Sequence, residues 1–459
     1  MTDRPASPPS RPSQVRSLNS SPLQRPTTGS LDGTPGAWNP PPLGKLEDTG
    51  LNLLAVADLV LKVLYFGGYM PGHRIADIVK LPYTNVLDTV MDFLKREKFA
   101  EVKGTGGGIG EAGYQWIISD AGAAKAREAL ERSQYAGPAP VTLQQYVDAM
   151  RMQNQEQRIV HEEQMKEVTK HLVISDEMLA RIGPAINSGK SIFLYGPPGN
   201  GKTTVAEQVG RIILGDNIWI PYAFDVDGQI IRVFDNVNHE LAEDEPKYRL
   251  GTGLIPDPRW VRIRRPMIMV GGELTLSGLD LVYDNINKYY EAPFQVKSNG
   301  GMFLIDDFGR QQVRPRDLLN RWIVPLEKGV DFLTLATGRK IEMPFFVLIV
   351  FSTNLDPRDL VDEAFLRRIR HKIEITDPSY EQYREIFKRV CSSKGIKYDE
   401  QALAYLLKEW YINQDRALRS VHPRDLLNQL IDIATYLNKP PMLTKDMIDR
   451  AAASYFVKL

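Results

Sequence analysis

The sequence has a single cysteine, Cys391, among 459 residues, which excludes an intrachain disulfide and a cluster of thiolate metal ligands. Its six histidines are scattered without the spacing of metal ligands, so we expect no structural metal site. Neither sign of charge is in excess, because 57 basic residues balance 57 acidic ones. The composition therefore predicts no global field that would attract nucleic acid or an anionic membrane.

Long uninterrupted apolar runs are also missing. The most apolar long segment, residues 51–70, contains Asp58 and Lys62 and is too polar for a membrane span. The N-terminal segment has no apolar core of the signal-peptide type. We therefore expect a reduced, cytoplasmic protein without a membrane segment, long enough for two or three domains.

Composition and periodicity divide the chain into five parts. Residues 1–45 are rich in Pro, Ser and Thr, which predicts a disordered tail. Residues 46–135 predict three helices, a hairpin around a glycine-rich tip, and a fourth helix. Residues 136–171 predict a Pro-containing link followed by an exposed polar helix. An α/β core at 172–375 and a helical lid at 376–459 complete the chain.

The order of elements in residues 46–135 resembles a winged-helix α+β domain. If it bound DNA, the third helix would enter the major groove and the tip would be the wing. The candidate outward positions of that helix include Thr84, Asn85, Asp88 and Asp92, and carboxylates repel phosphate. Residues 51–134 also balance ten basic against ten acidic side chains. Protein contact or ring assembly is therefore favoured over DNA.

A glycine-rich loop lies between a short apolar strand, residues 192–195, and an amphipathic helix. Its sequence, GPPGNGKT, is the GxxxxGK[ST] pattern in the strand–loop–helix setting that phosphate binding requires. Backbone N–H groups surround the phosphate, and the helix N-terminus adds its dipole. Lys202 is expected to reach the β- and γ-phosphates, and the Thr203 hydroxyl to ligate Mg²⁺. The predicted nucleotide-binding residues of the loop are Gly196, Pro197, Pro198, Gly199, Asn200, Gly201, Lys202, Thr203 and Thr204.

MFLIDD, residues 302–307, is a second apolar strand, and it ends in two adjacent carboxylates. We expect it beside the first strand, with Asp306 holding Mg²⁺ through water and Asp307 orienting or deprotonating the attacking water. The cation would offset the repulsion between the paired carboxylates. A third apolar run, residues 345–351, leads to Asn354, whose amide could hydrogen-bond the attacking water or the γ-phosphate.

These segments, in this order, resemble the motifs of the AAA+ ATPases. GPPGNGKT is similar to their Walker A, MFLIDD to Walker B, VFSTN to sensor 1, AFLRRIR to the arginine-finger segment and HPRDLLNQL to sensor 2. The resemblance covers about residues 170–459. It implies a parallel-sheet P-loop core with a helical lid, which binds ATP and Mg²⁺ as a homo-oligomeric ring, commonly a hexamer. It also implies that Arg367 and Arg368, with Arg370 as a further candidate, reach a neighbour's γ-phosphate, while Arg424 senses nucleotide from its own lid.

Two segments resemble the branch of AAA+ proteins with a hairpin before sensor 1, such as the MoxR-like and enhancer-binding ATPases. They are a hairpin predicted at residues 332–343, with its turn at Gly338, and YYEAPFQVKSNGG before Walker B. Such hairpins often carry the moving contact with a substrate. The chain departs from the family at one position, because Walker B usually ends in Asp-Glu rather than in Asp306 and Asp307. Hydrolysis could be slower as a result.

Two further features lie near Walker B. An insertion at residues 216–265 contains a predicted hairpin and a basic–aromatic cluster formed by Arg259, Trp260, Arg262, Arg264 and Arg265. Such a cluster can grip nucleic acid or meet an acidic neighbouring subunit, and the subunit contact is favoured. Tyr289 and Tyr290 could line a pore that pushes a substrate chain, but packing in the core is the favoured interpretation.

The sequence leaves three functions open. The favoured one is an AAA+ ATPase that hydrolyses Mg·ATP at the subunit interfaces of a ring and remodels a protein client. The second is a DNA-binding regulator or translocase that uses the winged helix. The third is a slowly hydrolysing nucleotide switch, suggested by Asp307.

Overall fold

The computed structural model describes residues 38–105, 110–154, 159–213, 217–243, 255–360 and 366–456. Most of the expected disordered tail, and the glycine-rich tip at 106–109, lie outside the described residues. Asn39–Leu459 form one unit, separate from Met1–Trp38. Within the described residues, no helix is both long enough and apolar enough to cross a membrane.

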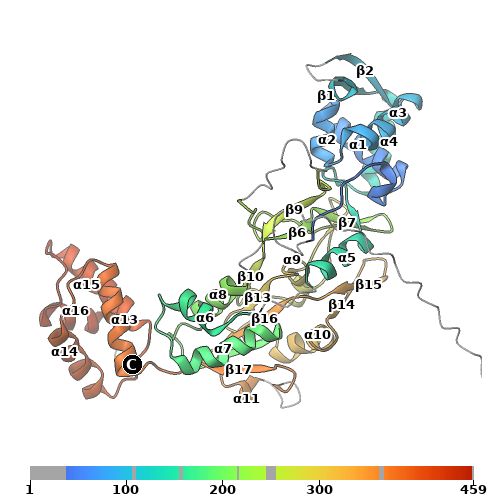
Figure 1. Cartoon of the computed structure of the whole chain (residues 1–459). Coiled ribbons are helices and arrows are strands. Elements are labelled where there is room, and N and C mark those ends of the chain that lie inside the picture. Colours follow the sequence, from blue (N-terminus) through green and yellow to red (C-terminus); the bar gives the residue numbers. More distant parts are fainter. Residues whose placement is uncertain are drawn as a thin grey trace, which may run out of the picture. The chain divides into compact units, whose positions relative to one another are not determined.

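Five parallel strands form the central sheet, in the order β10-β13-β16-β5-β17 (Figure 1). They are β10 (Met267–Val270), β13 (Met302–Ile305), β16 (Leu348–Thr353), β5 (Ile192–Tyr195) and β17 (His371–Glu374). The expectation that β13 lies beside β5 is wrong, because β16 pairs with both of them and lies between. β16 also begins at Leu348 rather than at Phe345, and it is buried along its whole length.

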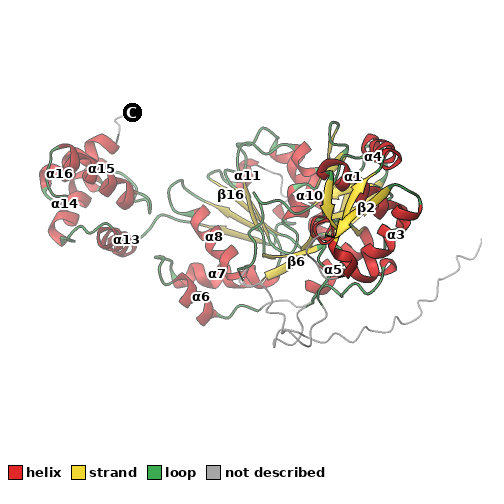
Figure 2. Ribbon diagram, turned by 90° about the horizontal axis from the view of Figure 1, so that it is seen from above, coloured by secondary structure: helices red, strands yellow, loops and turns green. Residues whose placement is uncertain are grey.

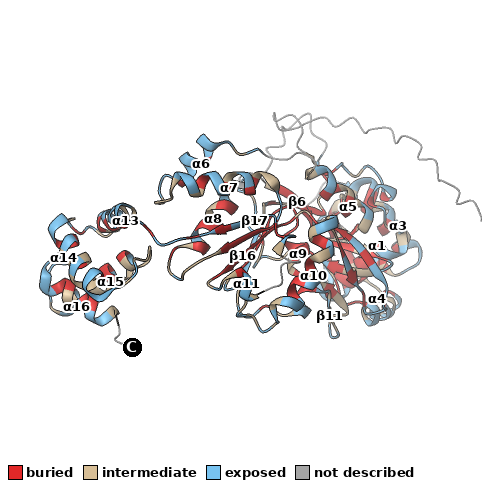
Figure 3. Ribbon diagram, turned by 90° about the horizontal axis from the view of Figure 1, so that it is seen from below, coloured by how far each residue is buried: buried red, intermediate tan, exposed pale blue. Residues whose placement is uncertain are grey.

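Each face of this sheet has its own core, because successive side chains of a strand point to opposite sides. Helices α7 (Asp176–Ser188) and α8 (Lys202–Ile213) cover one face, and α10 (Pro315–Lys328) covers the other (Figure 2). The first core includes Ile192, Leu194, Leu304 and Val350. The second includes Phe193, Phe303, Phe351 and Trp322. The three central strands, β13, β16 and β5, are therefore buried between two helical layers (Figure 3), and the predicted α/β class is confirmed.

A second five-stranded sheet has mixed direction and the order β11-β12-β8-β7-β4. Its strands are β4 (Val141–Thr142), β7 (Ala223–Val226), β8 (Gln229–Arg232), β11 (Val282–Asp284) and β12 (Tyr289–Glu291). β7 and β8 are the predicted hairpin of the insertion. A two-stranded sheet pairs β6 (Asn217–Pro221) with β9 (Trp260–Arg264). The insertion thus joins a sheet whose other strands come from both sides of it in the sequence.

The hairpin predicted before the third apolar strand is present. It consists of β14 (Val330–Thr334) and β15 (Lys340–Pro344), which pair in antiparallel register from Val330 and Pro344 to Thr334 and Lys340. Gly338 in the turn has a φ of 83°, a backbone conformation that glycine adopts without strain. β15 ends four residues before β16 begins, so the hairpin leads directly into the central sheet.

The single exposed helix expected between 142 and 171 is not observed. The described residues there form two helices, α5 (Leu143–Gln153) and α6 (Glu162–Thr169). Tyr146 of α5 is buried and stacks on Phe224 of β7, with ring centroids 5.1 Å apart. Met165 of α6 belongs to the first core of the parallel sheet. The overall polarity of the segment was misleading, because one face of each helix carries enough apolar side chains to pack.

The N-terminal described residues follow the predicted order, with one added strand. The elements are α1 (Leu53–Gly67), β1 (Tyr69–Pro71), α2 (Gly72–Val79), α3 (Asp88–Arg96), β2 (Ala100–Thr105), β3 (Tyr114–Ile118) and α4 (Asp120–Arg132). The strands form an antiparallel sheet in the order β1-β3-β2. The third helix begins later than predicted, because Asn85 has a φ of 66° and its N–H donates to the Asp88 carboxylate. Thr84 and Asn85 therefore do not lie on a regular α-helix.

The C-terminal residues form the four predicted helices. They are α13 (Tyr380–Ser393), α14 (Glu400–Trp410), α15 (His422–Tyr436) and α16 (Lys445–Tyr455). Side chains of Ser379, Asp399 and Thr444 accept hydrogen bonds from the first turns of α13, α14 and α16, which stabilises the starts of these helices. Their apolar faces share a core of their own, around Phe387, Leu403, Leu427 and Ile448.

Candidate functional site: the carboxyl edge of the parallel sheet

The glycine-rich loop connects the end of β5 to α8, and close packing fixes its course. A Cβ on Gly196, whose φ is 135°, would lie 2.3 Å from the carbonyl oxygen of Ile375. A Cβ on Gly199, whose φ is 80°, would lie 2.8 Å from Cγ1 of Val421. Both positions therefore require glycine, for conformation as well as for space. The loop is thus held between the end of β17 and the start of α15.

Lys202 is buried at the first position of α8, and its ammonium group is fully engaged. Nζ donates hydrogen bonds to the carbonyl oxygens of Gly196 (3.0 Å) and Pro197 (2.9 Å) and to Oδ1 of Asn354. Burial lowers the pKa of Lys202, and the negative charges of Asp306 and Asp307 oppose that shift. A phosphate in the loop could replace these acceptors and offer the ammonium a full negative charge.

Thr203 and Asp306 form the expected pair of oxygen ligands. The Thr203 hydroxyl donates to Oδ2 of Asp306 at 2.9 Å. Because β13 and β5 are two strand spacings apart, about 10 Å, the contact is made from α8 rather than from β5. The side chain of Gln311 donates to the Asp306 carbonyl oxygen at 2.9 Å and steadies the turn. A hydroxyl and a carboxylate are ligands that suit Mg²⁺, so these residues fit the cation that the sequence implies.

Asp307 adopts a left-handed backbone conformation, with a φ of 49°. Asp and Asn tolerate this region better than longer side chains, because their short polar groups can hydrogen-bond locally. Oδ1 of Asp307 accepts a hydrogen bond from Nδ2 of Asn354 at 3.1 Å. Asn354 therefore bridges the Lys202 ammonium and the second carboxylate. The backbone conformation gives a physical reason for aspartate at this position.

Two residues at this edge, Asp377 and Arg419, were not predicted from the sequence. Oδ1 of Asp377 accepts from Nδ2 of Asn200 at 2.6 Å and also pairs with the Arg419 guanidinium. The loop contacts the C-terminal helices through its backbone as well, because the N–H of Val421 donates to the Gly199 carbonyl at 2.8 Å. Asp377 lies three residues after β17, whose sequence His-Lys-Ile-Glu is polar, so no apolar strand in the sequence points to it.

Of the remaining predicted residues, the arginines are exposed or bond elsewhere, whereas Pro198, Gly201 and Thr204 belong to the loop and to α8. Arg367 is exposed and Arg368 bonds to Glu327, and both precede β17, whereas the loop lies at its carboxyl end. Nε of Arg424 donates to the neighbouring Asp425, and its side chain is 63% exposed. Pro198 and Thr204 are exposed in the loop and on α8, and Gly201 precedes Lys202 with a φ of 81°. The edge thus brings together Lys202, Thr203, Asp306, Asp307 and Asn354, but not Arg367, Arg368 or Arg424.

Arg259, Arg264 and Arg265 of the insertion's arginine cluster have partners within the chain. Arg259 is completely buried, pairs with Asp257, and donates to the carbonyl oxygens of Thr49 (2.8 Å) and Pro140 (3.0 Å). Arg264 pairs with Glu240 and Glu243. Arg265 is held by Asn154 and by the carbonyl oxygens of Gln153 and Gly300. These partners weaken the less favoured interpretation, in which the cluster grips nucleic acid, because the sequence showed the charge of the arginines but not their partners.

The two tyrosines before Walker B have different environments. Tyr290 is buried, packs on Tyr283 with ring centroids 4.8 Å apart, and accepts a hydrogen bond from the N–H of Ala336. The core interpretation is therefore confirmed for Tyr290. Tyr289 is only half-buried, and its ring meets Tyr135 edge to face at 5.6 Å.

Comparisons with known proteins give the following matches. The model of a domain of unknown function (DUF8689) matches residues 379–454, which span α13 to α16. NtrX from Brucella abortus in complex with ADP is 14% identical, with a TM-score of 0.37; the match covers 72% of this chain and 65% of that one. A point mutant of RuvB from Thermotoga maritima is 14% identical, with a TM-score of 0.33; the match covers 64% of this chain and 69% of that one. The chain thus spans less than two thirds of the NtrX chain.

Proposed function

We propose that this protein is an AAA+-type ATPase that binds and hydrolyses Mg·ATP at the carboxyl edge of its parallel sheet. The observation that carries the proposal is the convergence of Lys202, Thr203, Asp306, Asp307 and Asn354 from separate segments. Phosphate binding needs a cation and backbone N–H groups, and hydrolysis needs a polar group that can position water. Hydrogen bonds join Lys202 to Asn354 and Asn354 to Asp307, and a separate one joins Thr203 to Asp306.

In this proposal each of these residues has a separate role. The loop and Lys202 bind the phosphates, while Thr203 and Asp306 hold Mg²⁺, which supplies charge neutralisation between the phosphate oxygens when bound. Asp307 orients the attacking water and accepts its proton. Asn354 positions Asp307 and reaches toward the γ-phosphate. Arg419, from the residues just before α15, is a better candidate than Arg424 for reporting on bound nucleotide, because it already lies beside the loop through Asp377.

We further propose that the active form is a ring in which Arg367 or Arg368 completes a neighbour's site. Both arginines precede β17, whose four residues span about 13 Å. They therefore lie at the opposite end of this strand from their own loop, as a residue that acts on a neighbouring subunit would. A protein client fits the neutral charge balance better than DNA does, and the pairing of Arg259, Arg264 and Arg265 within the chain weakens one argument for DNA binding.

The domain boundaries belong to the same proposal. We assign a winged-helix-like domain to residues 46–135, the nucleotide-binding core to 172–375 and the lid to 376–459. α6 packs in the core of the parallel sheet through Met165 and extends the core toward the N-terminus.

The test is phosphate release by the purified chain with Mg·ATP. Lys202→Ala should abolish release, whereas Lys397→Ala, which removes an exposed lysine before α14, should leave it unchanged. A wild-type rate equal to that of Lys202→Ala would overturn the proposal and favour the non-hydrolysing switch. Size-exclusion chromatography with and without ATP tests the ring separately.

A further inference from the structure

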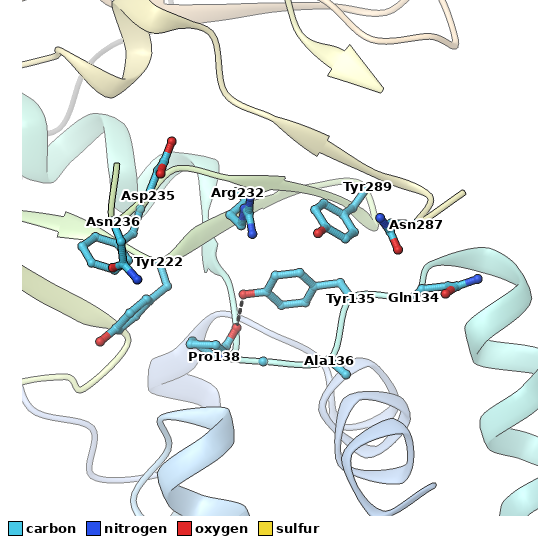
Figure 4. A pocket seen from close by; sticks show the side chains of 12 residues that line it. Gln134, Tyr135, Ala136, Pro138, Tyr222, Arg232, Asp235, Asn236, Asn287 and Tyr289 are labelled. Carbon is cyan, nitrogen blue, oxygen red and sulfur yellow. Dashed lines mark hydrogen bonds between the residues drawn. The ribbon is translucent and has the colours of Figure 1, made fainter. Parts of the chain in front are cut away.

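Aromatic rings line an open groove of about 520 Å³ that lies outside the proposed ATPase site (Figure 4). One wall is Tyr222 with Phe234, whose rings meet edge to face at 5.2 Å. The other is Tyr135 with Tyr289, which meet in the same way at 5.6 Å. Figure 4 shows Arg232 between the two walls. The residues that line the groove come from the link after α4, the segment between β6 and β7, the end of β8, and the β11–β12 turn.

The charged groups of the groove neutralise one another. Arg232 pairs with Glu291, and Lys297 lies 2.8 Å from Asp235 and 3.4 Å from Glu291. The two charged side chains that line the groove, Arg232 and Asp235, are thus each paired with a side chain outside the lining, so a charged ligand would leave one sign in excess. The other polar side chains at the groove, Gln134, Asn236 and Asn287, are neutral amides. The groove is suited to an uncharged ligand.

The polar groups of the groove favour a ligand that supplies hydrogen-bond acceptors. A guanidinium can only donate, and that of Arg232 carries more N–H groups than its pairing with Glu291 uses. Among the residues that the structure describes, the hydroxyls of Tyr222 and Tyr289 make no hydrogen bond, whereas that of Tyr135 donates to the carbonyl of Pro138 at 2.7 Å. Donors between aromatic walls match a segment with free carbonyls and few N–H groups.

We propose that this groove binds an uncharged, proline-rich segment of a partner protein in the polyproline II conformation. Proline has no N–H, its carbonyls point outward in that helix, and its ring packs flat on tyrosine. The conformation is largely formed before binding, so little entropy is lost. The groove lies apart from the carboxyl edge of the parallel sheet, and the proposal does not depend on ATPase activity.

The test is a fluorescence anisotropy titration of the full chain, without nucleotide, against an end-capped, fluorescein-labelled decaproline. Decaproline should bind, and a Gly-Ser peptide of the same length should not. Replacing both walls with Tyr222→Ala and Tyr289→Ala should weaken binding by about tenfold or more, because buried aromatic contacts dominate such interfaces. Tyr436→Ala, which removes a tyrosine that is 88% exposed on α15, is the matched control and should bind as the wild type does.

A milder pair of variants guards against misfolding. Tyr222→Phe with Tyr289→Phe keeps both rings and removes both hydroxyls, so it should give an affinity between those of the wild type and the alanine pair. Binding of decaproline no stronger than that of the Gly-Ser peptide would overturn the proposal. Unchanged affinity in the alanine pair would overturn it equally. So would binding of cellotriose, a short uncharged sugar, in place of decaproline. Because no nucleotide is present, failure of the proposed ATPase activity cannot produce any of these results.

Discussion

The two five-stranded sheets of this protein differ in the direction of their strands, and they therefore form different kinds of site. In the parallel sheet, β13, β16 and β17 all end at the same edge as β5, so Asp306, Asn354 and Asp377 gather there around one loop. In the mixed sheet, the pairs β11–β12 and β7–β8 are antiparallel, so the carboxyl ends of its strands do not all lie at one edge. Its groove is instead built on aromatic side chains between segments. Direction of pairing thus determines whether polar strand ends converge.

The largest expected effect tests this convergence. Asp306→Ala should reduce phosphate release by about a hundredfold or more, because the carboxylate proposed to hold Mg²⁺ is lost. Asp225→Ala removes a carboxylate from β7 in the mixed sheet and should leave the rate near that of the wild type. Steady-state kinetics of the two variants checks both. An equal loss of phosphate release in both variants would contradict the assignment of the ATPase site to the parallel sheet alone.

A second prediction concerns stability outside the parallel sheet. Arg259→Met should lower the free energy of unfolding by about 3–5 kcal/mol, because Asp257 would remain buried without its cation. Arg264→Met removes an arginine that is 48% exposed, and should cost less than about 1 kcal/mol. Chemical denaturation of both variants measures the difference. Similar losses would contradict the structural role assigned to Arg259.

The third prediction separates two arginines near the start of α15, Arg419 and Arg424. Arg419→Ala should lower the affinity for ATP by about tenfold, because the positive charge that it removes lies beside the loop. Arg424→Ala should change the affinity less than twofold, since this side chain pairs with Asp425 in solvent. Titration of each variant with a fluorescent ATP analogue distinguishes them. A larger effect from Arg424 would restore the role that the motif implied.

The smallest effect is expected when the Asp307 side chain is lengthened by one methylene group and keeps its charge. Asp307→Glu should lower kcat by about tenfold, since glutamate is strained by about 1 kcal/mol in a left-handed conformation and would place its carboxylate differently. Asp307→Asn keeps the backbone conformation and should abolish hydrolysis while ATP still binds. A faster Asp307→Glu enzyme would show that the short side chain, and not the backbone, limits the rate.

The sequence predicted the parts of the site that depend on contiguous residues. The loop from Gly196 to Thr203 is a local pattern, so its strand, its helix and the position of Lys202 followed from it. Asp306 and Asn354 could be predicted because each follows an apolar strand. The order of the strands could not, because nothing in MFLIDD specifies that β16 rather than β5 is its neighbour.

Long-range partners account for the rest of what the sequence did not predict. Arg419 reaches the loop only because the residues before α15 bond to Gly199 and Asn200. Arg259 suggested nucleic acid until its buried partner and two backbone acceptors were known. The groove is made of four rings that are up to 154 positions apart, from Tyr135 to Tyr289, so no local pattern marks it.

The central claim is that the carboxyl edge binds Mg·ATP, and calorimetric titration with ATP tests it most directly. The wild type should bind ATP more tightly with Mg²⁺ than without it. Thr203→Val should lose that difference, and Lys202→Ala should not bind measurably. Equal binding by the wild type and Lys202→Ala, or no heat of binding from the wild type, would contradict the account.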